Sequence, residues 1–164
     1  MNQVRTKFKV ISGGQTGVDR AALDVALELN ISCGGWCPKG RRAEDGVIDQ
    51  KYPLKETNAN EYAVRTEMNV KDSDGTLILT WGRPKSGTLL TLRLSKLHQK
   101  PHLVVDMKRS PNADDVILWI RRENIRVLNI AGPRQSFGNF VYKEAYNFIK
   151  DVLNHFKKNT TLLT

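Results

Sequence analysis

The chain has 164 residues, of which 40% are hydrophobic and 26% charged, and its formal net charge is +9. This composition is too apolar for a disordered chain, and the length suits a single domain over residues 1–164 with its own hydrophobic core. Apolar runs stay well short of the roughly 18 residues that cross a membrane, and the first residues lack the apolar core of a signal peptide. We therefore expect a cytoplasmic protein that has no membrane partner.

Basic residues occur singly or in pairs, and the chain contains no block of five or six. A net positive charge favours anionic partners, whereas nucleic-acid-binding segments often carry longer basic tracts. We expect a small anionic ligand, with nucleic acid as the weaker alternative.

Apolar runs and hydrophobic stripes alternate along the chain. The apolar runs predict strands at residues 8–12, 31–36, 75–81, 102–106 and 126–130. Stripes with helical spacing predict helices that begin near Val18, Leu90 and Val141, and weaker patterns predict helices over 59–72 and 112–123. Such alternation predicts a doubly wound α/β fold: a parallel sheet of about five strands, in the order 2-1-3-4-5, with helices on both faces.

Residues 34–58 interrupt this alternation, since they are rich in glycine, proline and charge and have no periodic pattern. A long irregular segment inside a compact domain is usually functional or disordered, and we expect this one to cross over the ligand crevice. It carries Lys39, Gly40 and Arg41, with Glu44 and Asp45 close behind. These groups could surround an anion, or they could form ion pairs within a solvated loop.

The loop after the first predicted strand is rich in glycine and lies where open α/β sheets bind ligands. Its candidate binding residues are Gly13, Gly14, Gln15, Thr16, Gly17 and Asp19. Glycines let the backbone approach a ligand, and amides at a helix start favour an anion. Thr16 could cap the helix with Asp19 reaching back, or Asp19 could bridge a metal, since its charge would repel phosphate. The spacing matches neither the dinucleotide fingerprint nor the Walker motif, so a glycine turn without ligand stays open.

The loop after the third predicted strand offers a second anion site. Ser86, Gly87 and Thr88 supply amides and hydroxyls where the next helix begins. Arg83 and Lys85 add positive charge, and Trp81 lies on the same rim. Two such loops at one edge of a sheet predict a phosphate site more strongly than either alone.

The loop after the fifth predicted strand contains Gly132-Pro133, which is ordinary turn composition, followed by Arg134. A guanidinium at this position could complete an anion clamp because it binds oxyanions through two parallel hydrogen bonds. An ordinary turn without ligand is the alternative.

Cys33 and Cys37 are the two cysteines of the chain, and the nearest histidine in sequence is His98. A zinc site usually has four ligands, so we expect reduced thiols near the end of a strand and no metal site formed by the protein. A contact with a soft metal or a ligand is the alternative.

Residues 12–19, 35–41, 43–46 and 86–88 resemble the molybdenum carrier (molybdenum cofactor carrier protein) family, and the similarity extends over roughly residues 8–156. This family is related to the lysine-decarboxylase-like (Lonely Guy) Rossmann superfamily. The resemblance implies a Rossmann-like homo-oligomer, dimer or tetramer, that binds molybdenum cofactor or molybdate. It also implies molybdoenzyme apoproteins as candidate recipients of the cofactor.

Enzymatic relatives in that superfamily hydrolyse nucleoside monophosphates and carry a P-G-G-x-G-T-x-x-E motif. Placing its G-T on Gly87-Thr88 puts Thr91 where the glutamate belongs. A threonine cannot replace a carboxylate base, so we expect a carrier that protects and delivers its ligand without turnover and has no catalytic residue. One alternative is a nucleotide-processing enzyme that uses Asp19 or Glu44. Another is a single-stranded nucleic-acid binder, for which Trp36 and Trp81 supply few stacking surfaces.

Overall fold

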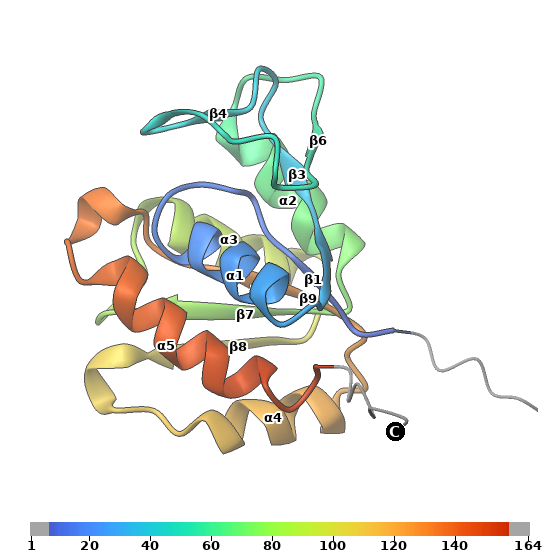
Figure 1. Ribbon diagram of the computed structural model, residues 1–164, viewed down its shortest axis with the longest axis vertical. Coiled ribbons are helices and arrows are strands. Elements are labelled where there is room, and N and C mark those ends of the chain that lie inside the picture. The colour runs from blue at the N-terminus through green and yellow to red at the C-terminus, as the bar shows by residue number, and fades with distance from the viewer. Residues whose placement is uncertain (1–6, 158–164) are drawn as a thin grey trace, which may run out of the picture.

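The computed structural model describes residues 7–157, and its centre is one sheet of five parallel strands (Figure 1). From edge to edge the strands are β2 (Ser32–Gly34), β1 (Lys9–Ile11), β9 (Val127–Ala131), β7 (Gly75–Thr80) and β8 (His102–Asp106). All four pairings between neighbouring strands are parallel. The predicted α/β class with a five-stranded parallel sheet is therefore confirmed.

The predicted strand order is wrong, because the last strand lies in the middle of the sheet. Numbered along the chain, the five strands follow the order 2-1-5-3-4, with β9 between β1 and β7. Burial explains why β9 and not β8 lies inside the sheet. The middle three residues of β9 are buried, whereas β8 at the edge leaves 39% of Val104 exposed. The polar Asn129 is accommodated in the central strand because its Nδ2 donates to Thr76 Oγ1 on β7 at 3.2 Å.

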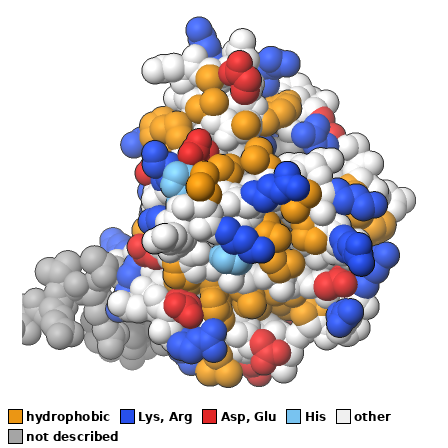
Figure 2. All heavy atoms as spheres, turned by 180° about the vertical axis from the view of Figure 1, so that it is seen from behind, with side chains coloured by type: hydrophobic (Ala, Val, Ile, Leu, Met, Phe, Trp, Pro, Cys, Tyr) orange, Lys and Arg blue, Asp and Glu red, His pale blue; other side chains and the backbone are white. Residues whose placement is uncertain are grey.

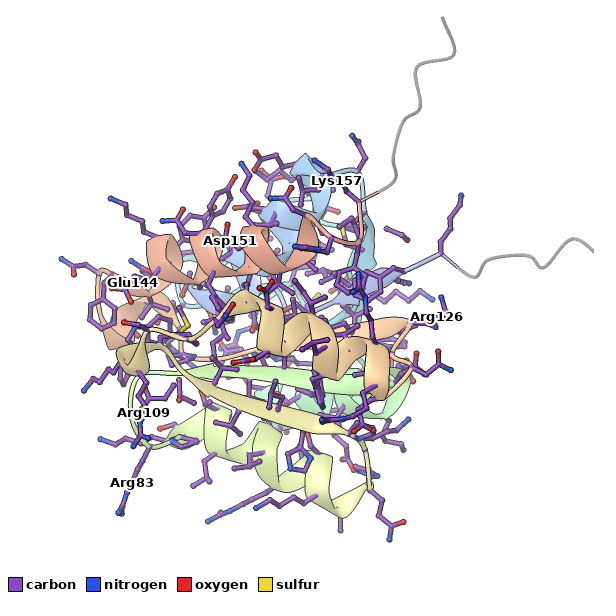
Figure 3. The ribbon with its side chains drawn as sticks, turned by 90° about the horizontal axis from the view of Figure 1, so that it is seen from below. Arg83, Arg109, Arg126, Glu144, Asp151 and Lys157 are labelled. Atoms are coloured by element: carbon purple, nitrogen blue, oxygen red, sulfur yellow. The ribbon has the colours of Figure 1, made fainter. Side chains whose placement is uncertain are left out.

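Helices cover both faces of the sheet, as the sequence predicts. The helices on one face, which pack against each other, are α1 (Val18–Glu28), α4 (Ala113–Arg122) and α5 (Val141–Leu153). The other face carries α2 (Tyr62–Asp72) and α3 (Ser86–Leu97). Figure 3 shows α4 and α5 on one side of β7 and β8 and α3 on the other. Among the described residues, no helix is long and apolar enough to span a membrane.

The two faces differ in what they bury. The main hydrophobic core includes residues of β1, β7 and β9 together with α1, α4 and α5, such as Val10, Leu79 and Ile149, which are fully buried. By contrast, α3 buries two threonines and a serine, and α2 buries Arg65 and Asn69 beside Val70. Polar groups are therefore concentrated between the sheet and the α2–α3 face, which is where the candidate site lies.

The predicted strand at 31–36 divides into two shorter strands at Gly35. The first part is β2, and the second, β3 (Trp36–Cys37), leaves the main sheet. Gly35 has φ of 129°, and a Cβ atom there would clash with the backbone of Ser12. Only glycine permits this close approach, so the chain turns out of the sheet here.

Residues 34–58 form an ordered layer, which projects at the top of the molecule in Figure 1. β3 pairs in parallel with β6 (Lys55–Glu56), and β4 (Arg42–Ala43) forms an antiparallel hairpin with β5 (Gly46–Val47). This layer packs against α1 through a small second core, made of Leu23 of α1 and of Cys37, Ile48 and Tyr52 of the layer. It covers the glycine-rich loop after β1, because Ile48 and Leu54 pack against Gly14.

Candidate functional site

A cavity of about 390 Å³ lies at the carboxyl ends of the central strands. The loops after β1, β7 and β9 all line it, together with the first turns of α2 and α3. The structure thus brings together the three loops that the sequence singled out, since parallel strands end at the same edge of the sheet. The predicted residues that line the cavity are Gln15, Asp19, Trp81, Ser86, Gly87, Thr88 and Arg134.

Positive charge dominates the walls of this cavity. Its lining includes four cationic side chains, Arg65, Arg83, Lys85 and Arg134, and a single carboxylate, that of Asp19. Arg83 and Lys85 are exposed at the rim, and Figure 3 shows Arg83 extending outward from the molecule. Within residues 7–157, neither of them lies within 4 Å of an acidic group. The rim therefore offers unpaired positive charge to an anion.

The start of α3 opens directly into the cavity. Gly87 has no neighbouring atom within 4 Å of the position a Cβ would take, so its surface is free for a ligand. The first amides of a helix have no acceptor within the helix, and they carry partial positive charge. Ser86 has φ of 48°, a left-handed conformation that costs energy for a residue with a side chain and often occurs at binding sites. This turn is shaped to present amides to an anion.

Asp19 and Arg65 form a buried ion pair in the wall of the cavity. Arg65 Nη1 donates to Asp19 Oδ2 at 3.0 Å, and the backbone amide of Gln15 donates to the same oxygen at 3.3 Å. Burial raises the pKa of the Asp19 carboxyl, although the charge and hydrogen bond of Arg65 act in the opposite direction. The guanidinium passes directly over Gly13, where a Cβ would clash with it. The ion pair therefore requires glycine at position 13, because only a residue without a side chain lets Arg65 reach Asp19.

The loop after β1 is largely occupied by protein groups. The Thr16 amide donates to Gln15 Oε1 at 3.1 Å, and the Val18 amide donates to the Pro133 carbonyl at 3.2 Å. The sequence suggested Thr16 as a possible N-cap of α1, and this interpretation is wrong. Gly17 is the N-cap, with φ of 78° and no side-chain cap. Gly17 is needed there because a Cβ would lie 2.5 Å from the Pro133 carbonyl oxygen. The open helix start is consequently that of α3.

Lys39, Gly40 and Arg41 do not line the cavity. The amides of Lys39 and Gly40 donate to Ala59 O at 2.9 Å and Glu56 Oε1 at 2.6 Å. Arg41 is 7% exposed, and its guanidinium donates to four carbonyl oxygens of the layer at 34–58. Arg41 therefore holds this layer together by hydrogen bonds.

Two site residues from α2 were missed by the sequence reasoning, Tyr62 and Arg65. The ring of Tyr62 lies near two guanidinium groups, with its centroid 5.6 Å from Arg65 and 5.4 Å from Arg134, and forms an aromatic wall of the cavity. One signal was present: Arg65 and Asn69, four residues apart, share the buried face of α2. Polar residues at helical spacing on an inward face indicate a site rather than core.

Trp81 also lines the cavity. It is 7% exposed, and its indole nitrogen donates to Glu144 on α5 at 2.7 Å. Phe140 packs against it with ring centroids 5.7 Å apart, and Phe137 of the loop after β9 continues this apolar surface to the cavity. The cavity thus combines aromatic walls, which suit a planar ring, with a cationic rim.

Two buried donors in this region have no hydrogen-bond partner within the described residues, Gln15 Nε2 and Arg65 Nε. Both side chains line the cavity. An unpaired buried donor costs free energy, so such groups usually mark a functional position. Thr91, at the bottom of the cavity, instead donates its hydroxyl to the Gly87 carbonyl at 3.0 Å. The site can hold an oxyanion through fixed donors, and its one lining carboxylate is already engaged by Arg65.

The cysteines take no part in this site. Cys37 is buried in the layer at 34–58, Cys33 is half-buried, and neither forms a disulfide. Burial raises the pKa of both thiols, which keeps them protonated. Within residues 7–157, no group of three or more histidine, cysteine or acidic side chains is placed to hold a metal ion.

The fold and the cavity define a Rossmann-like α/β protein with a cationic pocket at the carboxyl edge of its sheet. Comparison with known families makes the assignment: the chain belongs to the circularly permutated YpsA SLOG family, whose model matches residues 10–153. Comparison with curated proteins finds no match.

A solved structure supports the resemblance inferred from the sequence. The 1.45 Å crystal structure of a "putative molybdenum carrier protein" from Syntrophus aciditrophicus SB is 43% identical, with a TM-score of 0.85 over 90% of this chain and 96% of that one. The predicted resemblance is confirmed by this similarity. A second structure, of (E)-4-hydroxy-3-methyl-but-2-enyl diphosphate reductase, shares 15% identity over 88% of this chain and 59% of that one, with a TM-score of 0.37.

Proposed function

We propose that this protein binds and carries a phosphorylated anionic ligand, molybdenum cofactor or a close analogue, without turning it over. The observation that carries the proposal is the open first turn of α3, where Gly87 faces free space beside Arg83 and Lys85. Free amides at a helix start, together with unpaired cations, are what a phosphate group requires. The name of the 43% identical neighbour supports molybdenum as part of the cargo.

The residues of the cavity fit the organic part of such a ligand. The phosphate would lie against the amides of Ser86, Gly87 and Thr88. A planar ring would lie against the aromatic side chains of the lining. The metal of a molybdenum cofactor is held by the dithiolene of its own pterin, so the protein has to bind only the anionic and planar parts. Molybdate or a nucleotide would use the same donors.

Two residues that line the cavity support the absence of turnover. Thr91 stands at the position of the glutamate in the hydrolase motif, and its hydroxyl is bonded to the helix backbone. Asp19, the carboxylate of the lining, accepts two hydrogen bonds and is paired with Arg65. A threonine hydroxyl is too weakly basic to act as a general base, and the charge of the Asp19 carboxylate is neutralised by its ion pair with Arg65, which disfavours proton abstraction from a ligand.

Two measurements on the purified protein test this function. Calorimetric titration with molybdenum cofactor under anaerobic conditions should show saturable binding, and exposure to air should then destroy the bound cofactor more slowly than the free cofactor. Incubation with adenosine monophosphate and other nucleoside monophosphates should release no free base. Steady release above about 0.1 per second, a threshold below the usual range of enzyme turnover, would establish the hydrolase alternative instead.

We also propose that the protein forms a homo-oligomer, a dimer or a tetramer, and that this oligomer delivers the ligand to molybdoenzyme apoproteins. On the α2–α3 side, Leu97 of α3 is 71% exposed, and Val64 and Val104 are more than a third exposed. Figure 2 shows hydrophobic side chains in a band down the face opposite to that of Figure 1, flanked by Lys and Arg. An apolar surface of this kind favours association with a second copy. Light scattering should give a mass that is a multiple of 18.6 kDa at micromolar concentration, and a monomer alone would contradict the oligomer.

A further inference from the structure

The carboxylate of Glu44 is held by groups from two loops that lie far from it in sequence. It accepts hydrogen bonds from the Thr16 hydroxyl and, at 3.0 Å, from the Ser136 amide. Arg134 Nη1 lies 3.9 Å from its second oxygen. A hydroxyl, a backbone amide and a guanidinium are the donors that proteins use to bind an external oxyanion. Here the protein's own carboxylate takes that position, beside the cavity that Ser136 and Arg134 line.

The geometry fixes this carboxylate in place. Thr16 Oγ1 accepts from the Gln135 amide at 3.1 Å, which leaves its proton for Glu44. The Glu44 amide donates to Gln15 Oε1 at 2.9 Å, and Asp45, the next residue, pairs with Arg20 at 3.0 Å. Partial burial raises the pKa of Glu44, but the hydrogen bonds from Ser136 and Thr16 and the charge of Arg134 outweigh it and leave this pKa below its usual value. Glu44 is therefore held as an anion.

The cations of the cavity consequently fall into two groups. Arg65 is paired with Asp19 at 3.0 Å, and Arg134 faces Glu44 at 3.9 Å. Arg83 and Lys85, beside the start of α3, have no acidic group within 4 Å among residues 7–157. One end of the cavity is thus neutralised by the protein's own carboxylates, and the other end keeps its positive charge.

We propose that Glu44 is an internal anion that fills a second oxyanion position formed by Thr16, Ser136 and Arg134, and so excludes charged ligand groups from this end of the cavity. The inference rests on the proposed function, because it assigns the two ends of the same site. The external ligand places its phosphate at α3 and its uncharged polar ring at the neutralised end. Glu44 is in this sense a specificity residue, which disfavours ligands that would place a further anionic group at this end.

Gln15 supplies the matching donor at the neutralised end. Its Oε1 accepts from two backbone amides, those of Thr16 and Glu44, which fixes the orientation of the side-chain amide. Nε2 is then the donor of Gln15 that has no partner, and the residue is buried, with 5% of its surface exposed. A neutral amide donor suits a carbonyl or ring nitrogen, as pterins and nucleobases carry.

The test uses inorganic phosphate as the probe and amide chemical shifts of the ¹⁵N-labelled full chain as the readout. The variant G87D removes the phosphate position at α3, and E44A in that background empties the second position. We expect phosphate, against chloride at equal ionic strength, to shift the Ser136 amide saturably in E44A/G87D and not in G87D. D45A/G87D is the matched control, since it removes the neighbouring carboxylate of the same hairpin and should leave Ser136 unmoved.

An unmoved Ser136 amide in folded E44A/G87D would overturn the inference. If E44A does not fold, the ¹³C signal of the Glu44 carboxyl in the otherwise unchanged chain decides: a midpoint below 4.5 that rises in R134Q supports the proposal, and an ordinary midpoint unaffected by R134Q refutes it. The proposed function fails separately, when phosphate leaves the Gly87 and Thr88 amides of the unmodified chain unmoved. The Ser136 result still decides the role of Glu44 in that case.

Discussion

Replacing Gly87 by aspartate places a negative charge in the position that we assign to the phosphate of the ligand. The fold should tolerate the change, because a Cβ at Gly87 meets no atom within 4 Å and the residue does not have a positive φ. The matched control is Gly87→Asn, which has nearly the same shape without the charge. Any difference between the two variants therefore reports electrostatics alone.

The size of the effect follows from Coulomb's law. Two unit charges about 5 Å apart repel by roughly 1 kcal/mol in bulk water and by about 3 kcal/mol at the effective dielectric of a protein surface. That range corresponds to a Kd about 5- to 150-fold higher for the aspartate variant than for the asparagine variant. The difference should shrink when salt rises from about 0.05 to 0.5 M, since the rim is open to solvent and screened.

Calorimetric titration with inorganic phosphate and adenosine monophosphate measures both Kd values, and circular dichroism confirms that each variant is folded. Kd values for the aspartate and asparagine variants that both equal that of the unmodified protein would refute the reasoning, because they would place the bound anion away from α3. Kd values that are raised by the same factor in both variants would instead indicate that the site needs a bare glycine for steric reasons.

Three further outcomes follow from the structure. Gly13→Ala should lower the free energy of unfolding by about 3 kcal/mol in denaturant titration, because its Cβ displaces Arg65 and leaves Asp19 buried without its partner; an unchanged midpoint would contradict this packing. Arg41→Lys should cost about 2–4 kcal/mol and expose residues 38–56 to limited proteolysis, since four carbonyls lose their guanidinium donor; equal protease resistance would contradict it. Glu44 has a lowered pKa, so its stabilisation is present above pH 4.5 and is lost as the pH falls through the folded-state value; thermal unfolding of E44Q should show a weaker loss of stability below pH 4.5.

The sequence by itself determined the class of fold and the edge of the sheet where the site lies. Continuous apolar strands alternating with amphipathic helices specify a parallel sheet covered on both faces, and parallel strands must all end at the same edge. The observed α1 and α5 begin at Val18 and Val141, as their hydrophobic stripes predict, because that periodicity is a local property. The hydrophobic stripe places the third helix near Leu90, whereas α3 begins at Ser86, the helix start that the composition of its loop predicts, and this loop opens into the cavity.

Only the tertiary structure decided which strands are neighbours and which loop stays open. The predicted order placed the last strand at the edge of the sheet, but Asn129 of that strand donates to Thr76 of β7 across the sheet, a pairing between residues 53 positions apart. Likewise, glycine-rich composition marks the loop after β1 as a candidate site without showing what fills it. Glu44 reaches Thr16 and Ser136 from a separate hairpin, and Arg65 reaches Asp19 from a helix 46 positions further along the chain. Hydrogen bonding and charge pairing act over a few ångströms in space, whatever the separation in sequence, so these partners became visible only in the folded chain.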